Sequence, residues 1–303
     1  MRAGKPAAAG KDRSALNELK QGCSAEAIKK RQHGLGDNFM QTVTYQEDHL
    51  VKRHRGTMPV ILTCPHDGNK EPPGVEERKK EATPDGCQFT TKSDLQTALI
   101  TQSVAEKILD LIGLSPYVVM ASFDRKFIDA NRARSPVNCA FTDPAARPFY
   151  DQYHNRIADF VNEIRGQNDN RGFLFDIHGK VEIPEDPADI YLGTDNGGSL
   201  LPGFDRASIF MQHGLQGLLK SVRRDTGPAP APIFKYRLSP ADAKAPENSS
   251  VDGGFTVRRY GVFINSIQVE IADTIRDFEQ KRLFLIEDLA FAIINFARRH
   301  APF

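Results

Sequence analysis

Two histidines stand where an α/β fold usually binds its ligand. His66 follows the apolar run Val60-Ile-Leu-Thr-Cys-Pro, His178 follows Phe173-Leu-Phe-Asp-Ile, and a glycine comes soon after each histidine. Ligands of α/β sheets usually bind outside the carboxyl ends of the strands. Two imidazoles, one carboxylate and a water form a common catalytic zinc site, whereas a single histidine after a strand is more often a hydrogen-bonded structural residue. The residues alone leave both interpretations open.

The carboxylate that would complete such a metal site is not singled out by spacing. Asp94 begins a predicted helix, where an acidic residue also has a role in capping and in pairing with the helix dipole. Asp176, two residues before His178, points to the same side of its strand and could orient that imidazole. The candidates for the third ligand are Asp67, Asn69, Glu71 and Asp94.

One further acidic residue lies inside an apolar strand pattern. Glu270 occurs in Ile267-Gln-Val-Glu-Ile and alternates with Gln268 and Ser266, so one face of this strand is polar. Such a carboxylate is either exposed at the edge of a sheet or buried and functional. Beside a metal-bound water it is the natural general base.

Arginines near these segments suit an acidic substrate. Asn131 and Arg132 directly follow Phe127-Ile-Asp-Ala, and the planar guanidinium of Arg132 suits bidentate binding of a carboxylate. The alternative is an ion pair with Asp124 or Asp129. Arg258 and Arg259 follow a long loop and could also reach a cleft.

Other motifs exclude two kinds of chemistry. The segment Gly193-Thr-Asp-Asn-Gly-Gly lacks the Lys-Ser/Thr of a nucleotide-binding loop, so we reject nucleotide binding. No Gly-x-Ser-x-Gly elbow is present, and a serine triad is unsupported.

The elements that position these residues alternate along the chain from Met58 onward. Strand patterns cover 58–64, 117–121, 172–179, 189–194, 233–237 and 263–271, and helical patterns cover 93–112, 149–164, 204–224 and 276–299. Residues 239–254 are rich in Pro, Ala, Asn, Ser and Gly and predict a long loop. Strands alternating with helices predict an α/β fold, a three-layer αβα sandwich with a mixed, largely parallel sheet.

Composition excludes several classes of protein. The 303 residues carry 40 Lys and Arg against 39 Asp and Glu, which gives a net charge of +1 and no basic field for nucleic acid. No run approaches the roughly 18 apolar residues of a membrane helix, and the first residues lack the apolar stretch of a secretory signal. We therefore expect a cytoplasmic protein of enzyme size that binds neither nucleic acid nor membrane.

The cysteines and the first residues add two expectations. Cys23, Cys64, Cys87 and Cys139 form no CxxC pair, so we expect reduced structural thiols rather than a disulfide or a thiol nucleophile. Residues 1–45 are rich in Lys, Arg, Ala, Gly and Gln and contain few aromatic residues, which predicts a weakly structured extension.

Seven short segments occur in an order that resembles one known family. They are Cys64-Pro-His-Asp-Gly, Ser93-Asp-Leu, Phe127-Ile-Asp-Ala-Asn-Arg, Phe175-Asp-Ile-His-Gly, Leu192-Gly-Thr-Asp-Asn-Gly, Gly253-Gly-Phe-Thr-Val-Arg-Arg-Tyr-Gly and Gln268-Val-Glu-Ile. Together they resemble the N-formylglutamate amidohydrolase (deformylase) family, and residues 46–303 would form its catalytic domain. The resemblance implies a zinc-carboxypeptidase-like sandwich and metal-dependent hydrolysis of an amide.

The resemblance also implies roles for residues of this chain. His66, Asp94 and His178 would be ligands of a divalent metal, expected to be zinc, and Glu270 would be the general base. Arg132 would bind a substrate carboxylate, with Asn131, Arg258 and Arg259 also at the substrate. The chain departs from the pattern at Asn69, which is not a carboxylate, at Arg259, where a histidine is often found, and in the loop 239–252.

The expected substrate is a small N-formyl or N-acyl amino acid such as N-formylglutamate. One alternative is a metallo-carboxypeptidase or amidase that cleaves a peptide or cell-wall fragment with the same residues. A second alternative is a non-catalytic, ligand-binding descendant that has lost its metal, which the missing carboxylate at Asn69 keeps open.

Overall fold

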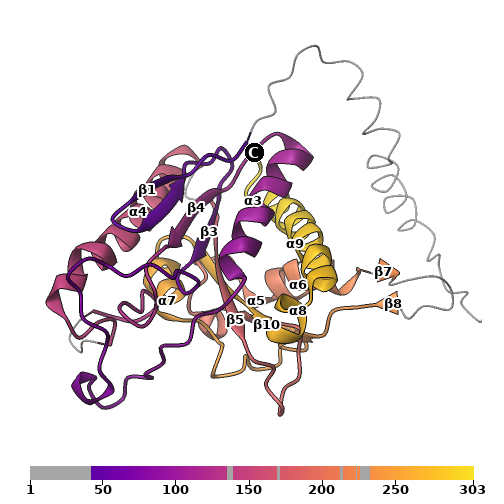
Figure 1. Ribbon diagram of the computed structural model, residues 1–303. Helices are drawn as coiled ribbons and strands as arrows, with labels where there is room; N and C mark the ends of the chain where they lie inside the picture. Colours follow the sequence, from indigo (N-terminus) through magenta and orange to yellow (C-terminus); the bar gives the residue numbers. More distant parts are fainter. Residues whose placement is uncertain (1–41, 135–138, 169–170, 212–213, 223, 226–232) are drawn as a thin grey trace, which may run out of the picture. The chain divides into compact units, whose positions relative to one another are not determined.

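A mixed sheet of eight strands carries the histidines and Glu270. The computed structural model (Figure 1) describes residues 42–134, 139–168, 171–211, 214–222, 224–225 and 233–303. The strand order is β1 (Gln46–Asp48), β2 (Val51–His54), β4 (Tyr117–Ala121), β3 (Val60–Cys64), β5 (Phe173–Lys180), β10 (Asn265–Ala272), β6 (Ile190–Gly193) and β9 (Leu238–Ser239). The central strands β4, β3, β5 and β10 run parallel, so their carboxyl ends share one edge of the sheet.

Helices cover both faces of this sheet (Figure 1). One face carries α3 (Thr97–Ile112) and α9 (Glu279–His300) side by side, together with the short helices α5 (Arg206–Phe210) and α6 (Leu215–Lys220). The other face carries α4 (Arg147–Gln167) and α7 (Phe255–Gly261). Because both faces are covered, β3, β4 and β10 are buried at every position, as is typical of parallel strands. The predicted three-layer αβα sandwich is confirmed.

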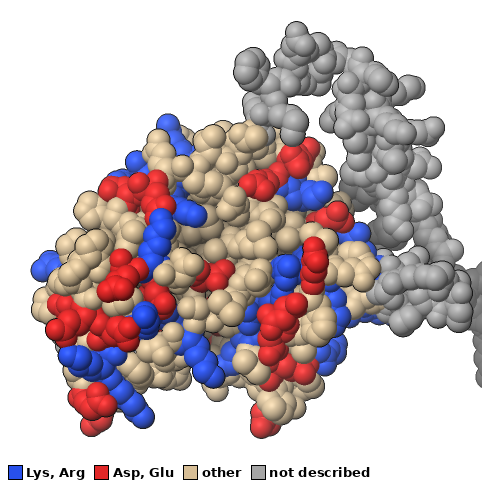
Figure 2. All heavy atoms as spheres, viewed as in Figure 1, with Lys and Arg blue, Asp and Glu red and all other residues tan. Residues whose placement is uncertain are grey.

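Short elements complete the description. They are α8 (Asp273–Arg276), the single 3-10 turns η1 (Lys80–Ala82), η2 (Pro144–Ala146) and η3 (Asp195–Gly197), and the separate pair β7 (Arg224–Asp225) and β8 (Ile233–Phe234). Positive and negative side chains are interspersed over the face shown in Figure 2. Within the described ranges, no helix has both the length and the apolar character to span a bilayer.

Most predicted elements form, and two differ. The helix predicted over 204–224 is divided into α5 and α6, because the backbone is extended at Met211 and at Gly214. The chain turns so closely at Gly214 that a Cβ there would lie 2.3 Å from the carbonyl oxygen of Ile209. The strand predicted over 233–237 forms only the short β8, and Arg258 and Arg259 lie in α7, which directly follows the predicted loop.

The expectation of reduced cysteines is wrong for one pair. Cys87 and Cys139 form a disulfide across 52 residues of sequence, joining two loops that no periodic pattern brings together. Cys64 is free and buried, and Cys23 lies outside the described residues. Because disulfides are rare in the cytosol, cysteine usage no longer supports the predicted cytoplasmic location.

The expected N-terminal extension lies almost wholly outside the described residues. Of residues 1–45 the structure describes 42–45, and Val43 is buried in the core that α3 and α9 form with the sheet. The backbone oxygen of Thr44 lies 2.8 Å from Nδ1 of His54 in β2. These residues therefore pack against the sandwich.

Gly68 provides a test of the loop that holds His66. A Cβ at Gly68 would lie 2.3 Å from the backbone oxygen of Phe123, so Gly68→Ala forces two backbone segments apart. We expect a loss of about 1–3 kcal/mol in the free energy of unfolding, measured by urea denaturation. The matched control is Gly166→Ala in α4, where an added Cβ meets no described atom. This variant should raise the free energy of unfolding by about 0.4–1 kcal/mol. Equal midpoints for the two variants would contradict this account of Gly68.

Candidate active site

A cleft of about 730 Å³ opens at the carboxyl ends of β3, β5 and β10. His66 follows β3, His178 lies near the end of β5, and Glu270 lies near the end of β10. The chain segments before α3, after β4 and before α7 complete the walls. The site therefore lies where parallel α/β sheets usually bind ligands.

Asp94 lies between the two imidazoles. Its Oδ2 is 3.2 Å from Nδ1 of His66 and 3.1 Å from Nδ1 of His178, and it accepts the backbone N–H of Gly179 at 3.1 Å. The backbone N–H of Asp94 in turn donates to the carbonyl of His66 at 2.9 Å. One ligand atom from each of the three side chains lies within 4.8 Å of the others, and all three residues are buried. This donor set suits zinc or another borderline divalent ion.

Each imidazole uses its other nitrogen to contact a second carboxylate. Nε2 of His66 lies 2.6 Å from Oδ1 of Asp129, and Nε2 of His178 lies 2.9 Å from Oδ2 of Asp176. Thr63 donates its hydroxyl to the other oxygen of Asp176 at 2.6 Å. A carboxylate that accepts Nε2–H fixes the tautomer and leaves the Nδ1 lone pair directed at Asp94, as a metal ligand requires.

Arg125 completes a ring of four contacting side chains, the other three being Asp94, His66 and Asp129. Its Nη1 donates to Oδ1 of Asp94 at 3.2 Å and its Nε donates to Oδ2 of Asp129 at 3.0 Å. Both aspartates also contact His66, one at each ring nitrogen. The guanidinium therefore fixes the two carboxylates that orient this imidazole.

The charges in this cluster shift the pKa values of its side chains. Burial opposes the charged form of Asp94, but the neighbouring His66 and His178 hold the pKa of Asp94 well below its usual range. Burial likewise disfavours a charged His178, yet Asp176 raises the pKa of that imidazole well above its ordinary value. Several carboxylates thus converge on two imidazoles and one guanidinium, and a divalent cation fits this excess of negative charge.

Glu270 lies beside His178 on the neighbouring strand. The two residues are paired in the register of β10 and β5. Oε1 of Glu270 accepts a hydrogen bond from Nε2 of Gln268 at 2.6 Å, whereas its Oε2 is buried without a partner among the described residues. Burial raises the pKa of Glu270 although the charge of His178 opposes the shift. A buried carboxylate with one unpaired oxygen is suited to accept and return a proton.

The remaining candidates for the third ligand lie elsewhere. Oδ2 of Asp67 accepts the backbone N–H of Ala98 in the first turn of α3 at 2.8 Å, and burial raises the pKa of Asp67 to about 6. Asn69 and Glu71 are exposed and are not among the residues that line the cleft. The structure brings Asp94, and none of these three residues, between the imidazoles.

Arg132 lines the cleft, and its guanidinium donates to the backbone oxygens of Gln88 and Asn131 at 3.4 and 2.9 Å. Arg125 forms the ion pair with Asp129 that was the alternative for Arg132. Within the described residues Arg132 forms no ion pair with a carboxylate. Its charge is therefore available to a ligand.

Asn131 also lines the cleft but is held by the protein. Its Nδ2 lies 3.1 Å from Nε2 of His178, and its Oδ1 accepts the backbone N–H of Thr256 in α7 at 2.8 Å. Because Nε2 of His178 donates to Asp176, Asn131 is held by α7 and lies beside this imidazole.

The two arginines of α7 differ in position, because Arg258 lines the cleft and Arg259 does not. Arg258 lines the cleft and pairs with Asp195 and Asp252 at 2.9 and 3.0 Å. Arg259 is not among the cleft residues, and its guanidinium lies over the rings of Phe255 and Tyr260. The structure therefore separates Arg259 from the other predicted substrate-binding residues.

Sequence reasoning missed several charged residues that line the cleft or lie behind it. Arg125 gave no periodic signal, and Asp129 was considered only as a partner of Arg132. Lys92, Lys180 and Arg276 also line the cleft.

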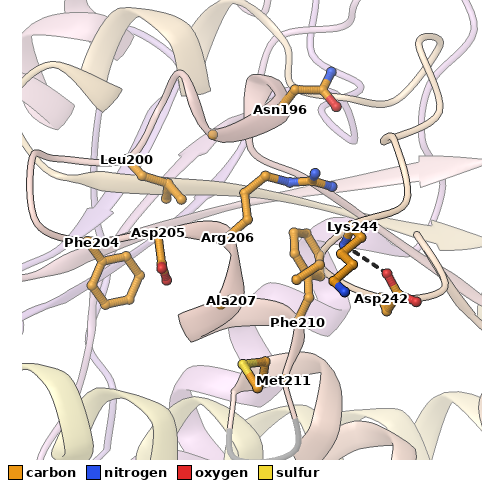
Figure 3. A pocket seen from close by; sticks show the side chains of 12 residues that line it. Asn196, Leu200, Phe204, Asp205, Arg206, Ala207, Phe210, Met211, Asp242 and Lys244 are labelled. Atoms are coloured by element: carbon orange, nitrogen blue, oxygen red, sulfur yellow. Dashed lines mark hydrogen bonds between the residues drawn. The ribbon is translucent and has the colours of Figure 1, made fainter.

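A second hollow, of about 850 Å³, lies beside α5 (Figure 3). Leu200, Phe204 and Phe210 form its apolar side, and Arg206 and Lys244 extend along its polar side. Among the described residues that line it, none is a histidine. The cleft at the histidines is therefore the site with groups suited to catalysis.

Comparison with known proteins supports the fold. No protein-family model matches the chain, and no curated relative matches it. The structure is similar to that of N-formylglutamate amidohydrolase from Ralstonia eutropha JMP134, with a TM-score of 0.56 and 14% identity over 84% of this chain and 98% of that one. It is also similar to a gene product of Agrobacterium tumefaciens, with a TM-score of 0.50 and 16% identity over 84% of this chain and 95% of that one. The chain therefore shares the fold of this N-formylglutamate amidohydrolase, as the motifs predicted.

The metal content of the purified protein tests whether His66, Asp94 and His178 hold a metal. We expect about one zinc per chain in the wild type and little in His178→Ala, because that variant removes one of three ligands. The exposed His49→Ala is the control and should keep the wild-type content. Elemental analysis gives the stoichiometry, and equal zinc in all three proteins would exclude His178 as a ligand.

The ring around His66 predicts a separate effect of Arg125. Arg125→Lys keeps the charge but cannot bridge Asp94 and Asp129 in the same geometry, so zinc affinity should fall about 10- to 100-fold. Arg132→Lys is the matched control, because Arg132 lines the same cleft without contacting a ligand side chain. Competition with a chromogenic chelator measures both affinities. A similar loss in the two variants would point to the charge of the cleft rather than to the ring.

Proposed function

We propose that this protein is a metal-dependent hydrolase that cleaves the amide bond of an N-formyl or N-acyl amino acid. The observation that carries the proposal is the buried group His66, Asp94 and His178 beside Glu270, whose Oε2 has no partner among the described residues. A metal site and a proton-accepting carboxylate on adjacent parallel strands are the two parts that such a hydrolysis needs.

His66 and His178, through Nδ1, and Asp94, through Oδ2, would hold the metal, and zinc is the ion that this donor set favours. A divalent ion bound there supplies Lewis-acid polarisation of a carbonyl and lowers the pKa of a water. Asp129 and Asp176 keep the imidazoles in the required tautomer and orientation.

Glu270 serves as general base and then as general acid. Its unpaired Oε2 accepts a proton from the attacking water, and the same group returns this proton to the leaving nitrogen as the C–N bond breaks. Gln268 holds the other carboxylate oxygen of Glu270, a residue that lines the cleft, and leaves Oε2 without a partner among the described residues. The raised pKa of Glu270 helps it to release the proton at the second step.

Arg132 binds the carboxylate of the amino acid. Its guanidinium is positioned by the backbone oxygens of Asn131 and Gln88, and a bidentate contact to a carboxylate would fix the amide against Glu270. Asn131 supports this placement through α7, and Arg258 lies at the wall of the cleft. The solved structure from Ralstonia eutropha is described as an N-formylglutamate amidohydrolase, which makes N-formylglutamate the first substrate to try.

Glu270→Gln tests the role of the base. This variant should retain about one zinc per chain and lose activity by about 10²- to 10⁴-fold, because Gln cannot accept the proton. Turnover is measured against N-formyl, N-acetyl and peptidyl substrates, with Glu71→Gln, exposed and outside the cleft, as the control. Wild-type activity in Glu270→Gln would exclude the base assignment.

The same panel separates the alternatives. Cleavage of the peptidyl substrates in preference to N-acyl amino acids would favour a carboxypeptidase or amidase. A wild-type protein that holds zinc and cleaves none of the three classes would contradict the proposal.

A further inference from the structure

Gln268 carries an unpaired polar atom at the cleft. It lies two residues before Glu270 on the same face of β10, lines the cleft, and is only 4% exposed. Its Nε2 donates to Oε1 of Glu270 at 2.6 Å. Its Oε1 is buried and, like Oε2 of Glu270, has no partner within the described part of the chain.

The contact with Glu270 determines which way the amide of Gln268 points. Turning the amide over would place Oε1 against a carboxylate oxygen, two acceptors with no proton between them. Nε2 must therefore face Glu270, and Oε1 must face away from it. A buried acceptor without a donor costs about 1–3 kcal/mol, so a donor from a bound ligand would recover that loss.

The chemistry of an N-acyl amino acid identifies that donor. Its acyl oxygen and its carboxylate oxygens only accept hydrogen bonds. The amide N–H is the one donor that all such substrates share, apart from an N-acylproline, whose nitrogen carries no hydrogen. Because Glu270 must reach the leaving nitrogen, this N–H is also the substrate group that comes nearest to Gln268, which is hydrogen-bonded to Glu270.

We propose that Oε1 of Gln268 accepts the N–H of the scissile amide and so restricts the enzyme to secondary amides. The inference rests on the proposed function, because it takes an N-acyl amino acid as the ligand. Gln268 is then a specificity-determining residue as well as a support for Glu270. A substrate with a methyl group on nitrogen has no hydrogen to offer and leaves Oε1 buried and unpaired.

Binding of two ligands that resist hydrolysis tests this inference on the metal-loaded full chain. N-methanesulfonylglutamate has an N–H, and its N-methyl analogue has none. We expect calorimetry to show about 10- to 100-fold tighter binding of the N–H ligand to the wild type. In Gln268→Met, which keeps the size of the side chain and removes the acceptor, the preference should fall to about two-fold or less.

Comparing the two ligands within one variant isolates the N–H. A displaced Glu270 would weaken both ligands alike, so it leaves their ratio unchanged. Gln216→Met is the matched control, because Gln216 is also buried but donates to the backbone oxygen of Pro240 away from the cleft. This variant should keep the wild-type preference.

Three results would overturn the inference. Equal binding of the two ligands to the wild type excludes N–H recognition without any variant. A preference that persists in folded Gln268→Met assigns the discrimination to the bulk of the methyl group. If neither ligand binds the wild type, the N-acyl amino acid site itself fails, whereas the first two results leave that proposal standing.

Discussion

The buried carboxylate of Asp94 is the contact on which the arrangement of this site depends. Its Oδ2 accepts the backbone N–H of Gly179 and lies beside Nδ1 of His66 and Nδ1 of His178, and its Oδ1 accepts from Arg125. These partners come from three stretches of the chain, so one side chain joins the ends of β3 and β5 to the loop after β4. An isolated buried carboxylate is costly, and this one is stable because every direction around it holds a positive or donating group.

The carboxylates of Asp129 and Asp176 suit this group of residues to a divalent metal. Asp129 and Asp176 are fully buried and would repel Asp94 if only Arg125 opposed them. In the protein without metal, Asp176 raises the pKa of His178, and a proton on this imidazole offsets part of the negative charge. A divalent cation would supply positive charge while His178 stays neutral, so binding it would release a proton. Burial opposes the charged form of Asp94, but the neighbouring imidazoles lower its pKa, so this carboxylate is ionised in the protein without metal.

The sequence predicts the parts of the site that belong to regular elements. Apolar runs indicate β3, β5 and β10, and with them the positions of His66, His178 and Glu270, because buried strands need continuous apolar residues. Asp94 is different, since no helix or strand fixes its distance from His66 and helix capping explains an acidic residue there equally well. Only the resemblance of several motifs favoured it. The contacts of Arg125 and the Cys87–Cys139 disulfide arise where loops meet, and loops carry no periodic signal.

The geometry of β10 places Gln268 and Glu270 side by side at the cleft. Side chains two residues apart on a strand point to the same face, so Gln268 and Glu270 enter the cleft together from β10. The hydrogen bond between them leaves each with one unpaired oxygen, an acceptor for a proton on Glu270 and an acceptor for an N–H on Gln268. Because β10 lies between β5 and β6 and is buried along its length, its backbone fixes the positions of both residues. The strand that positions the base therefore also positions the group that would recognise the bond to be broken.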